Sequence, residues 1–224
     1  LPVKRSRMFW NRVYTGLLYY LVPYMIMEFF AVCIGAAKGF FSLKLMELAA
    51  RLLLVHLLLY FLFYFSIVLV FCVTGNFLMG VLCLAGMQLY GPALGILMSF
   101  CAYGFFDTFS SNYPYGIFKA LEDYASPITL TAAFWQKYEA GQGAALAAVL
   151  FVLTLIFTAV SYFAYIHRPS EAAGKPMVYG KLAAVIKFMV VVPCGMGTGF
   201  VFYLIPTSHA RNIWCVFGMI LGTV

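Results

Sequence analysis

The sequence contains few charged residues. Only 9% of its 224 residues are Asp, Glu, Lys or Arg, whereas soluble domains carry about 25%. Acidic residues number 7 in all, and 65% of the chain is hydrophobic. A water-soluble fold cannot bury this much apolar surface, so the composition excludes a soluble globular domain. It predicts an all-α, polytopic bundle of transmembrane helices.

Sequence motifs for catalysis are also absent. We find no ATP-binding motif, no paired carboxylates, no nucleophile–base pair and no H-E-x-x-H. The AAGK fragment at residues 172–175 is not a phosphate-binding loop, because the first glycine is missing and Pro176 replaces the hydroxyl residue. We therefore expect no enzyme activity and no cofactor in this chain.

The cysteines and histidines give no pattern for a metal or a disulfide. None of the six cysteines belongs to a C-x-x-C motif, and none lies near a histidine at ligand spacing. His56 has no His, Cys or carboxylate three or four residues away, which predicts a neutral, hydrogen-bonded histidine. The cysteines are interpreted as small apolar residues: Cys33, Cys72, Cys83, Cys101, Cys194 and Cys215.

Long apolar runs are what the sequence does contain. A helix needs about 20 residues to cross a bilayer. The sequence predicts about five full spans plus a truncated sixth, with interfacial helices. The full spans are at 13–37, 52–74, 77–106, 144–166 and 182–206. The sixth run, 214–224, is too short to cross, and the chain begins with Leu, so we expect an internal piece of a longer protein.

Residues 1–12, LPVKRSRMFWNR, set the predicted orientation. They contain four basic residues and no acidic one, and basic flanks stay on the cytoplasmic side of a membrane. Two interpretations stay open, a short interfacial helix or a basic flank that only anchors the next span. The net charge of +7 is spread over short loops, so we expect membrane lipid rather than nucleic acid as its counterpart.

The long polar interval at 107–143 is predicted to lie outside. Its segments IFKALEDY and TAAFWQKYEA are candidates for short helices, although an ordinary external loop is the alternative. The sequence thus divides into three regions: a cytoplasmic segment at 1–12, a transmembrane region at 13–166, and a cytoplasmic loop with a transmembrane hairpin at 167–224.

Polar and helix-breaking residues inside the predicted spans mark a candidate translocation path: Glu28, Gln88, Gly91 and Pro92. Glu28 is either a substrate or proton site, or a carboxyl group bonded to a neighbouring helix. The Gly91-Pro92 pair is expected to break or kink its helix, and Gly91 with Gly95 forms a G-x-x-x-G pair that allows close packing. Small residues beside one amide suit a cavity wall, but packing alone would also account for them.

Two segments carry a resemblance to a known family. LPVKRSRMFWNR followed by GLLYYLVPYMI resembles the cytoplasmic segment that joins the second and third spans of ABC-2-type transporter permeases. HRPSEAAGKPM, at 167–177, resembles a loop of such permeases from Gram-positive bacteria. The resemblance implies that residues 1–12 form a coupling helix that contacts an ATPase subunit. It also implies an outer re-entrant helical hairpin within 107–143.

The resemblance further implies a permease subunit in the cytoplasmic membrane, powered by a separate ATPase and paired with a second permease subunit, identical or different. The ATPase-contacting residues would be Arg5, Arg7, Phe9 and Trp10, with the aromatics as anchors and the arginines setting the register. An ion-coupled secondary transporter is the alternative, for which Glu28 and His56 are the only support.

Overall fold

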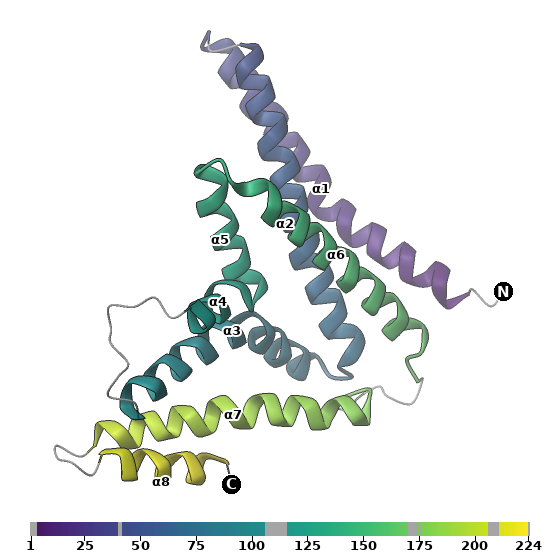
Figure 1. The fold of residues 1–224 in the computed structure, drawn as a ribbon. Coiled ribbons are helices and arrows are strands. Elements are labelled where there is room, and N and C mark those ends of the chain that lie inside the picture. The colour runs from purple at the N-terminus through teal and green to yellow at the C-terminus, as the bar shows by residue number, and fades with distance from the viewer. Residues whose placement is uncertain are drawn as a thin grey trace. The chain divides into compact units, whose positions relative to one another are not determined.

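The described residues form an all-α structure. The computed structural model describes residues 4–39, 42–105, 116–169, 174, 176–205 and 211–223. Within them lie eight helices, and the only β-pairing is an isolated bridge, which confirms the predicted fold class. The helices are α1 Arg5–Ala37, α2 Leu43–Val73, α3 Phe77–Phe105, α4 Gly116–Tyr124, α5 Pro127–Glu139, α6 Gly143–Ile166, α7 Gly180–Leu204 and α8 Arg211–Thr223 (Figure 1).

Five of these helices, α1, α2, α3, α6 and α7, are long and apolar enough to cross a membrane. They coincide with the five predicted spans, which makes the chain a candidate multi-pass membrane protein. The described part of the sixth apolar run lies in α8, whose 13 residues are fewer than a crossing needs. The first three residues, most of the loop after Pro169, and residues 106–115 of the polar interval lie outside the described residues.

Two helices begin earlier than the predicted spans: α2 begins at Leu43, before the predicted start at 52, and α1 begins at Arg5. The sequence predicted an interfacial helix ending near residue 12, but α1 begins at Arg5 and continues without interruption for 33 residues. No proline or glycine occurs between Arg5 and Thr15, so nothing in the backbone chemistry ends the helix there. The basic segment is therefore the first part of the same helix as the first candidate span.

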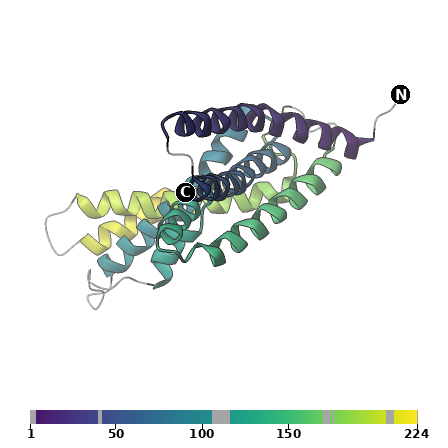
Figure 2. The same cartoon turned by 90° about the horizontal axis from the view of Figure 1, so that it is seen from above.

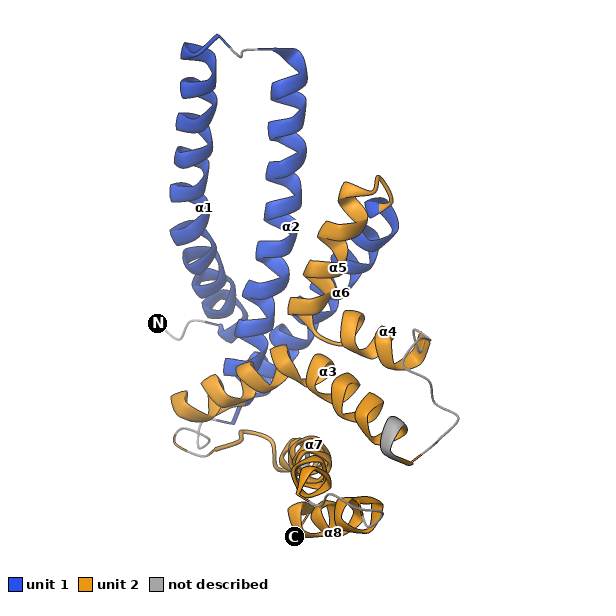
Figure 3. Cartoon of the chain, turned by 90° about the vertical axis from the view of Figure 1, so that its left-hand side faces the viewer, with its two compact units in different colours: residues 1–73, 143–173 blue, residues 74–142, 174–224 orange. Residues whose placement is uncertain are grey.

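The chain divides into two compact units, which are described separately (Figure 3). The first contains α1, α2 and α6, and its helices α2 and α6 pack side by side. Both helices bury small hydroxyl side chains that bond to their own backbone: Ser66 donates to the Phe63 carbonyl at 2.7 Å and Ser161 to the Phe157 carbonyl at 2.6 Å. Small, internally satisfied residues of this kind let apolar helices approach closely.

In the second unit, α4 and α5 form a helical hairpin that packs against α3. The two helices are joined at Ala125 and Ser126, and the Ser126 hydroxyl accepts a bond from the Thr129 amide at 3.3 Å. Pro127 follows in the first helical turn, where proline is tolerated. The two short helices predicted within 107–143 are thus confirmed, and an ordinary loop is excluded for their residues.

The same unit contains a second helical hairpin, α7–α8 (Figure 1; Figure 2). Glycines four residues apart on each helix face the other: Gly195 and Gly199 on α7, and Gly218 and Gly222 on α8. A Cβ atom on Gly218 would lie 2.8 Å from the Thr198 carbonyl oxygen, too close for any larger residue. The glycines therefore permit a backbone contact between these two helices.

Two loops predicted to be cytoplasmic meet within the second unit. Thr74 and Met177 form an antiparallel bridge, and the Gly174 amide donates to the Gly75 carbonyl at 3.1 Å. Segments paired through their backbones lie on the same side of a membrane. The pairing therefore agrees with the predicted topology, in which both loops face the cytoplasm.

We predict that a cysteine at Asn76 and one at Gln142 react with a membrane-impermeant maleimide from opposite sides. Both positions are exposed, and the α6 span separates Gln142 from the cytoplasmic loops. Single cysteines in a cysteine-free version, labelled in intact cells and in inverted vesicles, measure this directly. Labelling of both positions from one side would refute the topology.

Candidate functional site

The basic start of α1 is built into the core of the first unit. Phe9 is only 2% exposed and packs in a cluster with Val13, Phe65 and Cys72. Its ring centroid lies 5.6 Å from that of Tyr162 and 5.3 Å from that of Tyr165, both near the end of α6. Phe9 and Val13 are four residues apart, so they share the helix face that turns toward the other two helices.

Two arginines tie the ends of three helices together at this point. The Arg5 guanidinium donates from Nη1 to the carbonyls of Ile166 at 3.1 Å and Arg168 at 2.9 Å, where α6 ends. Arg168 in turn donates to the Phe71 carbonyl at 3.1 Å, in the last turn of α2. The last carbonyls of a helix lack partners within it and carry partial negative charge, so a cation is favoured there.

The structure separates the four predicted ATPase-contacting residues. Phe9 is buried, Arg5 is bonded to α6, and Trp10 is half-buried with its ring 6.0 Å from that of Tyr162. Arg7 is exposed. It belongs to an exposed stripe on one helix face, which we call the outer stripe: Lys4, Arg7, Met8 and Asn11.

Glu28, on α1, accepts a hydrogen bond from the Tyr24 hydroxyl at 3.0 Å. This partner is on the same helix, one turn earlier, whereas one of the two predictions placed it on a neighbouring helix. His56, on α2, has Nδ1 at 2.8 Å from the Leu52 carbonyl, which confirms the expected hydrogen bond. The Tyr24 ring centroid lies 5.9 Å from that of His56, so Tyr24 touches both the carboxylate and the imidazole.

Aromatic side chains of α1 also pack against aromatic side chains of α2, and we call this contact the α1–α2 seam. The Tyr64 hydroxyl donates to the Val13 carbonyl at 3.1 Å, and the rings of Tyr20 and Tyr60 stack at 4.0 Å. A Cβ atom on Gly16 would lie 2.3 Å from the Tyr64 hydroxyl oxygen, so a larger residue there would displace the Tyr64 hydroxyl from this position. The seam was not predicted from the sequence, although its residues recur every four positions and so share one face of each helix. They are Tyr20, Tyr24 and Glu28 on α1, and His56, Tyr60 and Tyr64 on α2.

The other three path candidates, Gln88, Gly91 and Pro92, lie on α3 in the second unit, whereas Glu28 lies in the first. The helix continues through Pro92, so Gly91-Pro92 does not break it. A Cβ atom on Gly91 would lie 2.8 Å from the Ala125 carbonyl carbon, and one on Gly95 would lie 3.0 Å from the Glu122 amide nitrogen. The glycine pair thus packs against the α4–α5 hairpin, as the close-packing prediction required.

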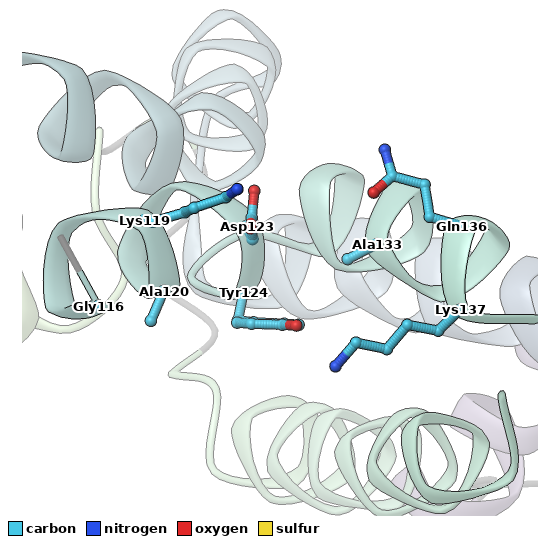
Figure 4. A pocket seen from close by; sticks show the side chains of 8 residues that line it. All are labelled: Gly116, Lys119, Ala120, Asp123, Tyr124, Ala133, Gln136 and Lys137. Atoms are coloured by element: carbon cyan, nitrogen blue, oxygen red, sulfur yellow. The ribbon is translucent and has the colours of Figure 1, made fainter. Parts of the chain in front are cut away.

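An open hollow of about 380 Å³ lies between α4 and α5 (Figure 4). Lys119 and Asp123 stand on one wall, and Lys137 reaches from α5 with its Nζ 5.2 Å from the Tyr124 ring centroid. This cation–π contact ties the two helices together. The charges are mixed and face solvent, so the hollow gives no defined ligand chemistry. Among the described residues, no three His, Cys, Asp or Glu side chains are grouped to hold a metal ion.

No known protein family, curated protein sequence or solved structure matches the chain. The resemblance to ABC-2-type permeases therefore rests on the two sequence segments alone. The structure itself establishes a helical protein with five candidate membrane spans.

We predict that Phe9→Ala destabilises the first unit by about 3–5 kcal/mol, because it leaves a cavity among rings that cannot collapse into it. The matched control is Phe29→Ala on the same helix, where the side chain is 66% exposed and its loss leaves no cavity. Thermal unfolding of the purified chain in detergent measures the difference. Equal melting temperatures for the two variants would contradict the packing role of Phe9.

Proposed function

We propose that the chain is the membrane-spanning subunit of an ATP-driven ABC-2-type transporter in the cytoplasmic membrane. A separate ATPase subunit supplies the energy, and a second permease subunit, identical or related, completes the complex. The supporting observation is the start of α1, which is fixed to the ends of α2 and α6 on one face and keeps the outer stripe exposed on the other.

This arrangement is suited to transmitting force. A load applied to the outer stripe reaches α6 through two kinds of contact, the packing of Phe9 on Tyr162 and Tyr165 and the bonds from Arg5 to the α6 carbonyls. Packed interiors have low compressibility and shift as blocks. A push at the start of α1 would therefore move α6 as well, rather than bend a free terminal segment.

The outer stripe has the chemistry of a partner surface. Arg7 and Lys4 provide charges that orient a docking partner, and Met8 is 39% exposed and flexible enough to fill an irregular apolar site. The complementary ATPase surface would be an apolar cleft with an acidic rim. Phe9 is buried on the opposite face of α1 and thereby fixes the orientation of the outer stripe.

An ion-coupled secondary transporter is the second candidate, and one observation favours it. Tyr24 bonds to Glu28 and its ring lies beside that of His56, and all three residues belong to two candidate spans. Ionisable residues inside a membrane often mark ion or proton paths. The two candidates differ in their energy source. An ABC permease transports only with its ATPase and ATP, whereas a secondary transporter requires an ion gradient.

We predict that Arg7→Lys combined with Met8→Ala weakens ATPase binding about tenfold, which corresponds to 1.4 kcal/mol. The double variant preserves every positive charge, so topology should be unaffected. It removes the bidentate donor geometry of arginine and the apolar contact of methionine. Binding is measured between the purified chain in nanodiscs and a purified ABC ATPase subunit.

Met27→Ala is the matched control, because Met27 lies on the same helix and is 71% exposed but belongs to the membrane-spanning part. It should bind the ATPase like the unaltered chain. Unchanged ATPase binding and stimulated hydrolysis in the double variant would show that the outer stripe is not the coupling surface.

A further inference from the structure

We propose that the α1–α2 seam contains a binding site for a lipophilic organic cation, formed by Tyr20, Tyr24 and Glu28 of α1 with Tyr60 of α2. This site goes beyond the proposed function, because it lies within the first unit and requires no ATPase. Glu28 would supply the charge and the tyrosine rings would supply the cation-binding faces.

Glu28 differs from the other acidic residue of these two helices in its partner. Glu47 pairs with Arg51, whereas the partner of Glu28 among the described residues is the neutral Tyr24 hydroxyl at 3.0 Å. Within the described part of the chain, no Lys, Arg or His nitrogen forms an ion pair with Glu28. An ionised carboxylate inside a membrane is costly without a counter-charge, so a cationic ligand would stabilise it.

The surroundings of Glu28 are aromatic. The rings of Tyr20 and Tyr24 are nearly parallel with centroids 5.8 Å apart, and Tyr20 stacks on Tyr60 at 4.0 Å. The face of an aromatic ring attracts a cation through its quadrupole, more strongly where water is excluded. The bond from Tyr24 to Glu28 holds the carboxylate at the hydroxyl end of the Tyr24 ring, and Tyr24 links it to the stacked pair of Tyr20 and Tyr60.

Pro23 provides a second, independent feature of the site. Proline has no amide hydrogen, so the carbonyl of Tyr19 receives no helical bond from residue 23. The residue next to Tyr20 in sequence thus contributes a backbone acceptor that lacks its helical donor, about one turn before Tyr24. A carbonyl dipole without its helical donor adds to the attraction for a positive charge.

The composition of the site favours a large organic cation over a metal ion. Hard metal ions need several oxygen ligands, and Glu28 is a single carboxylate with no grouped His, Cys, Asp or Glu among the described residues. His56 offers its ring beside Tyr24, while its Nδ1 is engaged with the Leu52 carbonyl. The neighbouring side chains Met27, Phe29 and Leu54 are exposed and apolar, so a ligand that arrives through lipid must itself be lipophilic.

The test compares two ions of the same shape and opposite charge, tetraphenylphosphonium and tetraphenylborate. Equilibrium dialysis of each radiolabelled ion is carried out with the purified full chain in detergent, and binding to protein-free micelles is subtracted. We expect saturable binding of the phosphonium and none of the borate. Equal saturable binding of both ions, or no saturable phosphonium binding, would overturn the proposal.

Variants then locate the site. Glu28→Gln should weaken phosphonium binding about tenfold or more, and Tyr60→Leu should weaken it severalfold, since each removes one cation contact. Glu47→Gln is the matched control on α2 and should bind normally, because its carboxylate is exposed and already paired. Normal binding by a Glu28→Gln chain that elutes as a folded monodisperse protein would overturn the assignment. The ion comparison on the unaltered chain decides the question even if the variant fails to fold.

Discussion

The contact between the start of α1 and the end of α6 is the interaction on which the first unit depends. Phe9 is enclosed by rings from α6 and by Phe65 of α2, and Arg5 occupies the negative end of the α6 dipole. A basic segment that would otherwise be a flexible flank thereby becomes part of a packed three-helix unit. The same contact leaves the outer stripe facing away from the unit, which is what a docking surface requires.

Several polar side chains of the first unit are satisfied by backbone carbonyls, as an apolar environment demands. Ser66 and Ser161 bond to their own helices, Arg168 reaches the last turn of α2, and the tyrosines of the seam donate to carbonyls of α1. Glu28 is the exception among the acidic residues of α1 and α2, since its partner is neutral. A bound cation would supply Glu28 with the charged partner that Glu47 already has in Arg51.

The spans and the α4–α5 hairpin could be predicted because apolar run length and short amphipathic segments are local properties of the sequence. The continuation of the basic segment into α1 was missed although it is also a local property, since no proline or glycine interrupts the sequence between Arg5 and Thr15. A break at Gly91-Pro92 does not occur, and Gly91 instead packs on Ala125, a contact between distant residues that local sequence does not show. The burial of Phe9 could not be predicted from the local sequence, because its partners Tyr162 and Tyr165 follow more than a hundred residues later.

The central claim is that the start of α1 and the end of α6 move as one block in the proposed transporter. Spin labels at Thr15 and His167, both exposed, report the distance between these two elements by pulsed electron paramagnetic resonance. The measurement is made in the complex with its ATPase, without nucleotide and with ATP under non-hydrolysing conditions. The account predicts the same distance distribution in both states, while a second pair that includes a label on the ATPase changes. A shift between Thr15 and His167 on addition of ATP would contradict it.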